Sequence, residues 1–151
     1  MAFTGRPQTF LDSTLSNDGF FPILSLGDFQ KIYRVPADRA QEAVEHQLKV
    51  ARNLVNDTLV AEKAAWELDG YATLAAVDLG ENSDLVSYYL DAVYLKAKAE
   101  LLHDFQTFTR RDQADDIAKD GDGTYQALLA NSNRAVRRLK GITTNITAEL
   151  L

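Results

Sequence analysis

The sequence contains no cysteine, which excludes a disulfide framework and a metal site built on thiolates. This absence also fits a reducing cytosol. No segment approaches the roughly eighteen uninterrupted apolar residues of a membrane-spanning helix. Residues 1–19 lack the apolar run of a signal peptide. We therefore expect neither a membrane span nor a secretion signal.

Positive charge is scarce. The chain has 16 lysine and arginine residues against 22 aspartate and glutamate residues, a formal net charge of −6. This balance argues against a general coating of nucleic acid, because neutralising phosphates requires a cationic surface. A hydrophobic fraction of 46% over 151 residues favours one folded domain over disorder.

Glycine and proline are missing from residues 37–69, and this gap predicts one long helix over residues 36–69. Pro36 suits the first helical turn, because the N–H group that proline lacks would have no helical partner there. Weak helix formers at residues 56–58 allow a kink or a short break in the middle.

Apolar residues follow this expected helix in two rows. The first row recurs at steps of about four or seven residues and predicts a buried stripe. It consists of Ala40, Val44, Leu48, Ala51, Val55 and Leu59. The second row, called here the outer row, consists of Ala43, Val50, Leu54, Ala61 and Ala65. A helix with two apolar rows is expected to be central and to touch two neighbours.

Three further helices are expected. The first is short, at residues 28–33, with Ser25 or Asp28 as its cap. The next runs over residues 85–108 from a cap at Ser83 or Asp84, and the last runs over residues 124–140 and ends at Gly141. Residues 109–123 predict a polar loop. The expected fold is therefore all-α and resembles a four-helix bundle with one long central helix.

Both ends of the chain predict flexible arms, so the expected divisions are an arm at 1–19, a helical domain at 20–141 and a tail at 142–151. The first arm is rich in polar residues with scattered apolar ones, and we expect it to order only on assembly. The tail is rich in β-branched residues. It indicates either strand addition to another chain or a frayed end.

No arrangement of residues predicts catalysis. Glu100 and His103 have the Glu-x-x-His spacing of di-iron bundles, but such a site needs two copies and the chain has one. Residues 120–123 (DGDG) lack the further ligands of a calcium loop and predict a turn that starts a helix. No phosphate loop or nucleophile motif is present. We predict no catalytic, metal-binding or cofactor-binding residue and no enzyme activity.

The strongest positive cluster is at the end of the last expected helix. It consists of Arg134, Arg137, Arg138 and Lys140, joined by Arg110 and Arg111 from the expected loop. One interpretation is contact with an acidic partner or a nucleic-acid backbone. The other is stabilisation of the negative helix end together with pairing to nearby aspartates. Both interpretations remain open at this stage.

Several short sequences follow one another in a distinctive order. They are Phe20-Phe21-Pro22, residues 35–39 (VPADR), Ser87-Tyr88-Tyr89 with Ala92-Val93, and residues 134–141 (RAVRRLKG). Over roughly residues 20–141, their order and spacing resemble the head completion/stabilisation proteins of tailed bacteriophages, the L protein family. None of them is a catalytic signature.

The resemblance implies a virion protein at the portal vertex, in the neck, that assembles in the host cytoplasm. Such an adaptor would bind the portal after DNA packaging, stabilise the filled head and prepare tail attachment as a head-tail connector. The implied partners are the portal protein, copies of the same chain in an oligomeric ring (expected to be twelvefold), tail or neck proteins, and genomic DNA that passes without sequence readout. The acidic balance fits a channel wall that repels DNA. No cofactor and no membrane are implied.

We expect the portal or subunit interface to combine the basic cluster, the tail and an aromatic pair. The residues are Arg134, Arg137, Arg138, Lys140, Ile142, Ile146, Leu150, Phe20 and Phe21. The main alternative is a helical nucleic-acid-binding or regulatory module that uses the basic face of the last helix. A third hypothesis is an enzyme built on buried carboxylates.

Overall fold

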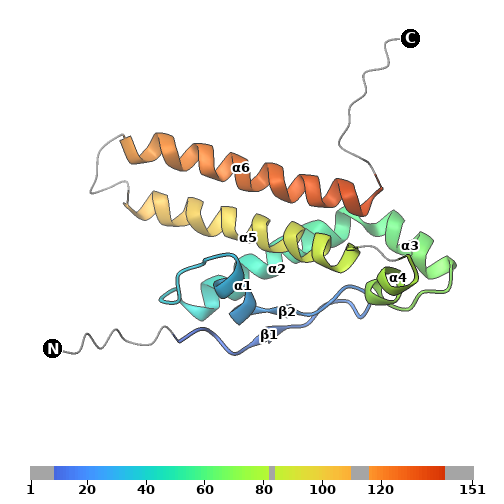
Figure 1. Ribbon diagram of the computed structural model, residues 1–151. Helices are drawn as coiled ribbons and strands as arrows, with labels where there is room; N and C mark the ends of the chain where they lie inside the picture. The colour runs from blue at the N-terminus through green and yellow to red at the C-terminus, as the bar shows by residue number, and fades with distance from the viewer. Residues whose placement is uncertain (1–8, 82–83, 110–115, 142–151) are drawn as a thin grey trace, which may run out of the picture.

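The computed structural model describes residues 9–81, 84–109 and 116–141 (Figure 1). In chain order the elements are β1 Thr14–Leu15, β2 Leu24–Ser25, α1 Leu26–Ile32, α2 Gln41–Thr58, α3 Val60–Leu68, α4 Leu74–Glu81, α5 Leu85–Thr109 and α6 Asp116–Leu139. The expected all-α class is broadly confirmed, with a small antiparallel sheet added. The expected four-helix bundle is not confirmed, because the described residues form six helices.

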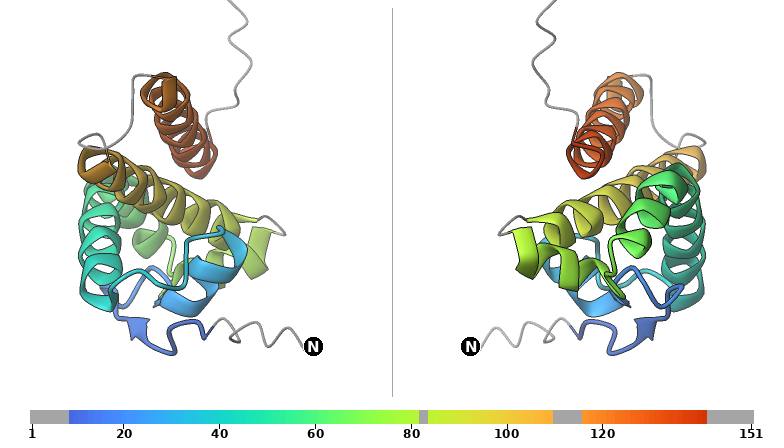
Figure 2. Two further views of the ribbon diagram at one scale, coloured as in Figure 1. Left: turned by 90° about the vertical axis from the view of Figure 1, so that its left-hand side faces the viewer. Right: turned by 90° about the vertical axis from the view of Figure 1, so that its right-hand side faces the viewer.

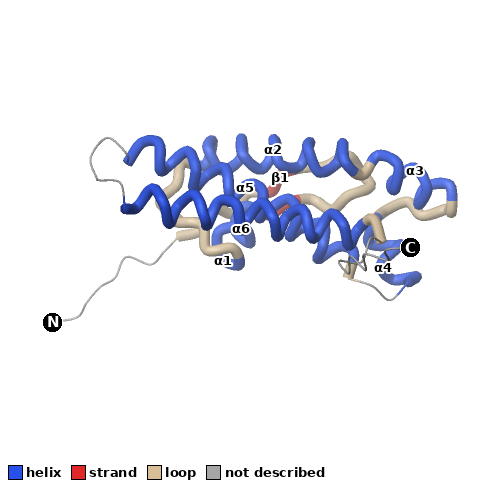
Figure 3. The backbone as a smooth tube through the Cα atoms, turned by 90° about the horizontal axis from the view of Figure 1, so that it is seen from above, coloured by secondary structure: helices blue, strands red, loops and turns tan. Residues whose placement is uncertain are grey.

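Helix α5 lies at the centre of the molecule and packs against α2, α4 and α6. Figure 2 shows α6 on one side of α5 and the strands on the other. Seen from above, α2 and α6 run along the long direction of the molecule, with α3 and α4 at one end (Figure 3). The prediction that the helix of residues 36–69 is central is therefore wrong. The central helix is α5, because its apolar residues face several neighbours.

The helix expected over residues 36–69 is divided into α2 and α3. It begins at Gln41 instead of Pro36, because Pro36 accepts a turn hydrogen bond from the Arg39 N–H at 3.3 Å. The break falls at Leu59, whose side chain is fully buried. Just before it, the Thr58 hydroxyl donates to the Leu54 carbonyl at 2.8 Å, a local bond that competes with regular helix. The break allowed from the sequence is thus confirmed.

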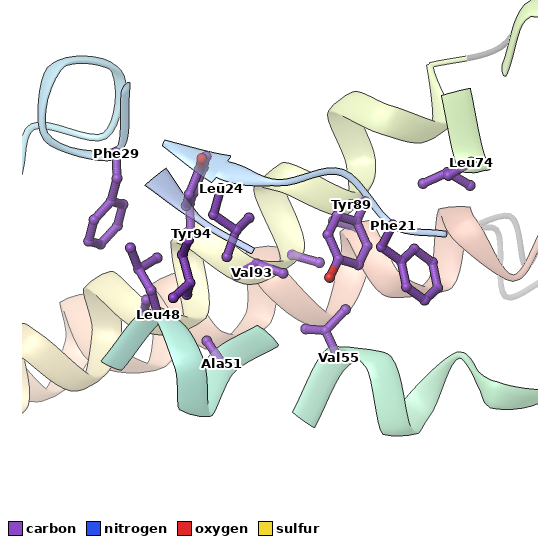
Figure 4. Close-up of a cluster of buried hydrophobic side chains, with 14 of the residues drawn as sticks. Phe21, Leu24, Phe29, Leu48, Ala51, Val55, Leu74, Tyr89, Val93 and Tyr94 are labelled. Carbon is purple, nitrogen blue, oxygen red and sulfur yellow. The ribbon is translucent and has the colours of Figure 1, made fainter. Parts of the chain in front are cut away.

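The core lies between α2, α5 and the amino-terminal strands (Figure 4). Phe21 stacks on Tyr89 with ring centroids 4.6 Å apart and an interplanar angle of 3°. Phe29 stacks on Tyr94 at 5.3 Å. The first apolar row of α2 faces these rings, as the spacing predicted. Its buried members are Val44, Leu48, Ala51, Val55 and Leu59, whereas Ala40, the first residue of the predicted row, is exposed.

Residues 9–19 pack on the helical domain, whereas the sequence predicted a flexible arm that orders only on assembly. Strands β1 and β2 pair in the register Thr14 with Ser25 and Leu15 with Leu24. The Leu26 N–H donates to the Ser13 carbonyl at 3.0 Å, and the Leu15 side chain is buried. The scattered apolar residues of this segment therefore complete the core of the same chain. Residues 1–8 lie outside the described residues.

Three polar side chains close a ring of hydrogen bonds inside the core. The Asn17 side-chain amide donates to the Tyr89 hydroxyl at 2.8 Å, and that hydroxyl donates to Asn56 Oδ1 at 2.6 Å. The Asn56 amide donates back to Asn17 Oδ1 at 2.9 Å. Burial raises the pKa of Tyr89, so its hydroxyl stays protonated. The ring fastens the amino-terminal segment to α2 and α5.

Replacing Tyr89 by phenylalanine is expected to lower the free energy of unfolding by about 1–3 kcal/mol, because Asn17 and Asn56 lose their shared partner inside the core. Urea unfolding measures the change. Tyr88→Phe is the matched control, since the Tyr88 hydroxyl makes no hydrogen bond to the described residues. Equal effects of the two replacements would contradict a stabilising role of the ring.

The helix ends show which capping residues could be predicted from the local sequence. Ser25 caps α1 by accepting from the Asp28 N–H at 3.1 Å, as predicted. Gly141 follows α6 with φ +71°, a backbone conformation that suits glycine. At α5, the Asp84 carbonyl accepts from the Tyr88 N–H at 3.0 Å, which places Asp84 at the expected cap position, and the Asp78 carboxylate accepts from the Leu85 N–H at 2.9 Å. Ser83, the other expected cap, lies outside the described residues.

Helices α4 and α6 also include residues for which the sequence predicted connecting segments instead of helix. α4 forms within the stretch expected to link the long helix to residue 85, because Leu74 and Val77 bury one of its faces. α6 begins at Asp116, so residues 120–123 lie within a helix and do not form the expected initiating turn. Packing along α5 outweighs the low helix propensity of Gly121 and Gly123.

Candidate interaction surface

The basic cluster lies along the last two turns of α6, and its members differ in exposure. The side chains of Arg134, Arg137 and Arg138 are exposed, and Lys140 is half-buried. Arg134 donates to Asn131 Oδ1 at 3.1 Å on the same helix. Arg137 has no hydrogen bond or ion pair to the described residues. Among the described residues, neither Arg134 nor Arg137 forms a hydrogen bond or an ion pair with another helix.

The rest of the cluster contacts its own chain. The Arg138 guanidinium lies 5.4 Å from the centre of the Tyr88 ring, a cation–π contact to α5. Lys140 Nζ is 3.7 Å from the Glu62 carboxylate of α3. Part of the basic cluster therefore stabilises the packing of α6. Arg110 and Arg111 lie outside the described residues.

Phe20 and Phe21 are placed in the core, although the sequence predicted them at an interface. Their exposed fractions are 4% and 3%. Phe20 stacks on Trp66 at 6.0 Å, and the Leu74 N–H donates to the Phe20 carbonyl at 2.9 Å. Both rings are covered by this chain and are therefore not accessible to a partner. Ile142, Ile146 and Leu150 lie outside the described residues.

The outer row of α2 and α3 is an apolar surface that the described residues leave uncovered, while Ile23, Ile32, Leu68 and Leu79 are exposed outside it. All five of its members are exposed, including Val50 at 37% and Leu54 at 49%. Val60, at the start of α3, adds a side chain that is 62% exposed. The sequence indicated this row by its spacing but did not single it out as a site, because the spacing also fits a second buried face. The structure shows that no described element covers it.

Asp18 joins the amino-terminal segment to α3. Its Oδ1 accepts from the backbone N–H groups of Phe20 and Phe21, each at 3.0 Å, and its Oδ2 lies 3.0 Å from Lys63 Nζ. Burial alone would raise the pKa of the Asp18 carboxyl. The hydrogen bonds from Phe21, Lys63 and Phe20 outweigh burial, so this pKa lies below its usual value.

Replacing Asp18 by alanine is expected to cost about 1 kcal/mol of unfolding free energy at neutral pH, since hydrogen bonds to a charged acceptor are lost. Because the folded pKa is lowered, this contribution is present above about pH 4 and disappears as pH falls through the folded pKa. Urea unfolding of both proteins at pH 7 and pH 3 tests the sign. Asp57→Ala, on the exposed side of α2, is the control. A stability gap that is unchanged at pH 3 would contradict the assignment.

Glu100 and His103 do not form a metal site in the structure. Glu100 accepts from the Tyr125 hydroxyl at 2.8 Å, which raises the pKa of Tyr125, and the His103 ring lies 5.0 Å from the same tyrosine ring. Across residues 9–81, 84–109 and 116–141, histidine and acidic side chains form no group of three that could hold a metal ion. These residues pack α6 on α5.

No described helix combines the length and the apolar character that crossing a membrane requires.

Comparison with known proteins identifies the family. Residues 15–150 match the family described as phage head completion protein (GPL). A relative from Haemophilus phage HP1, named as a probable head completion/stabilization protein, is 28% identical over 142 residues, which are 92% of this chain and 93% of the relative. No solved structure matches the chain. The match over most of its length, in agreement with the resemblance noted from the sequence, shows that this chain belongs to the phage head completion protein (GPL) family.

Proposed function

We propose that the protein binds the portal of the DNA-filled head, stabilises the head there and prepares it for tail attachment. Its family membership makes it a structural, virion-associated protein of phage head assembly and places it in no known class of enzymes. The observation that carries the finer proposal is the outer row, an exposed apolar surface on α2 and α3. A head completion protein needs such a surface, because it must bind other proteins of the vertex.

Covering this apolar surface would contribute favourable free energy to assembly in multiple copies. Fully burying a valine or leucine side chain stabilises by about 1.5–3 kcal/mol. Val50 and Leu54, about half exposed, would therefore each contribute about 1 kcal/mol when covered. We propose that copies of the chain cover this row by packing side by side on the portal in a ring, with twelve copies the expected number. In a ring the small gain per copy is multiplied by the number of contacts.

The negative net charge of the chain supports the proposal that genomic DNA passes through the channel without sequence-specific contacts. The chain has a formal net charge of −6, and an acidic channel wall would repel the phosphate backbone. Arg134, Arg137 and Arg138 are exposed, but three guanidinium groups provide a small cationic surface for nucleic acid. We therefore prefer a structural role to the nucleic-acid-binding alternative and propose that these arginines contact acidic neck or tail proteins.

Co-sedimentation with the purified cognate portal tests the proposal. The protein is expected to sediment with the portal, and Leu54→Glu is expected to remain in the supernatant, because a buried charge replaces an apolar contact. Gln126→Glu adds the same charge at an exposed position of α6 and serves as the matched control. Failure of the unmodified protein to sediment with the portal, or full binding by Leu54→Glu, would contradict the proposal.

A further inference from the structure

Helix α3 turns its apolar residues outward, whereas two of its charged residues face the rest of the chain. The half-buried Glu62 lies 3.7 Å from Lys140 Nζ, and the half-buried Lys63 Nζ lies 3.0 Å from Asp18. No residue of α3 is fully buried. Five exposed apolar residues have the spacing of a single helix face, which we call the α3 face. They are Val60, Ala61, Ala64, Ala65 and Leu68.

The α3 face is continuous and carries no polar side chain. Leu68 is 88% exposed and Val60 is 62% exposed, and alanines lie between them. Single exposed apolar residues are common on soluble proteins, whereas a contiguous apolar patch marks a surface that another segment covers. The described part of the chain leaves all five residues exposed.

The chain that follows Gly141 starts beside this face. The contact of Lys140 with Glu62 places the end of α6 against the first turn of α3. Figure 1 shows α3 and the end of α6 at the same end of the molecule. Five extended residues span up to about 17 Å, and Leu68 lies about 9 Å along α3 from Glu62. The tail, residues 142–151, is therefore long enough to cross the α3 face.

The sequence of the tail fits a surface that is apolar on one side. In an extended chain, alternate side chains point to opposite sides, and β-branched residues favour this conformation. One side would carry Ile142, Thr144, Ile146, Ala148 and Leu150, and the other Thr143, Asn145, Thr147, Glu149 and Leu151. Such a segment covers an apolar surface while its more polar side stays in water. The family match extends to residue 150, so nearly all of the tail belongs to the sequence that the family shares.

We propose that the tail lies extended across the α3 face of its own chain, with the Ile146 side chain on Leu68. The short connection from Gly141 favours the tail of the same chain over that of a second copy, because the tether keeps its local concentration high. The α2 part of the outer row stays open, and a partner that binds α3 must displace the tail. The inference goes beyond the proposed function and does not depend on binding to the portal.

The absence of cysteine allows a direct test in the full chain, because two introduced cysteines have no other thiol to join within it. With oxidised glutathione as the oxidant, Leu68→Cys with Ile146→Cys is expected to form a disulfide within one chain roughly tenfold faster than Glu67→Cys with Ile146→Cys. Glu67 is also exposed but points about 100° away around the helix. Equal rates for the two pairs would overturn the proposal. So would a disulfide between two chains on a non-reducing gel, which would assign the α3 face to a second copy.

NMR spectra of the full chain give a second measurement that needs no cysteine. Ile146→Asp is expected to shift the amide signals of Ala64 and Leu68, because a charge placed on an apolar face is released into water. Thr147→Asp adds the same charge on the polar side of the tail and should leave these signals in place. Equal shifts in the two variants, or no shift on α3 in either, would contradict the packing.

Discussion

Phe21→Ala is expected to lower the free energy of unfolding by about 3–5 kcal/mol, because it removes a buried aromatic ring and leaves a cavity. The Phe21 ring stacks on Tyr89 and meets Phe20 edge-on at 5.2 Å. Chemical denaturation monitored by far-UV circular dichroism measures the loss. The result would place this aromatic pair in the core and not at an interface.

Ile23→Ala is the matched control for this change. Ile23 lies two residues further along the same segment, and its side chain is 64% exposed. Its replacement is expected to change stability by less than about 0.5 kcal/mol. If Phe21→Ala were as mild as Ile23→Ala and instead abolished assembly, the aromatic pair would belong to an interface, and the packing described for residues 9–25 would be wrong.

The double replacement Val50→Glu with Leu54→Glu is expected to leave the fold intact and to stop head completion. Both side chains are exposed, so the monomer loses little packing. At an assembled interface the two charges would remove about 2 kcal/mol of apolar burial and add the cost of desolvation, which together weaken binding more than about a hundredfold. Complementation of a phage that lacks this gene, scored by heads that retain DNA, measures the effect.

The matched control for the double replacement is Gln126→Glu with Asn133→Glu. It adds the same two charges at exposed positions of α6. Circular dichroism of both variants should match the unmodified protein. Normal yields of filled heads with the α2 variant, or equal loss with the α6 variant, would show that the outer row is not the assembly surface.

Much of the fold followed from short-range signals. The four-residue and seven-residue spacing in α2 identified the buried row from Val44 to Leu59 and, beside it, the row that proved to be exposed. Ser25 and Gly141 marked helix ends through their side-chain hydrogen bond and their backbone preference. Such signals act within a few residues, so the sequence alone displays them.

The errors arose where distant residues decide the outcome. Spacing shows that a helix has two apolar rows but not whether a neighbour covers the second, so α2 was expected at the centre in place of α5. The contacts of Asn17 with Asn56 and Tyr89 join three separate segments and turn an apparent arm into part of the core.

Cryo-electron microscopy of the neck in the mature virion tests the central claim most directly. The account predicts a ring of this chain against the portal, with Val50 and Leu54 of each copy covered by a neighbouring subunit or by the portal. Absence of the chain from the vertex would contradict it, and so would a bound chain whose outer row still faces solvent.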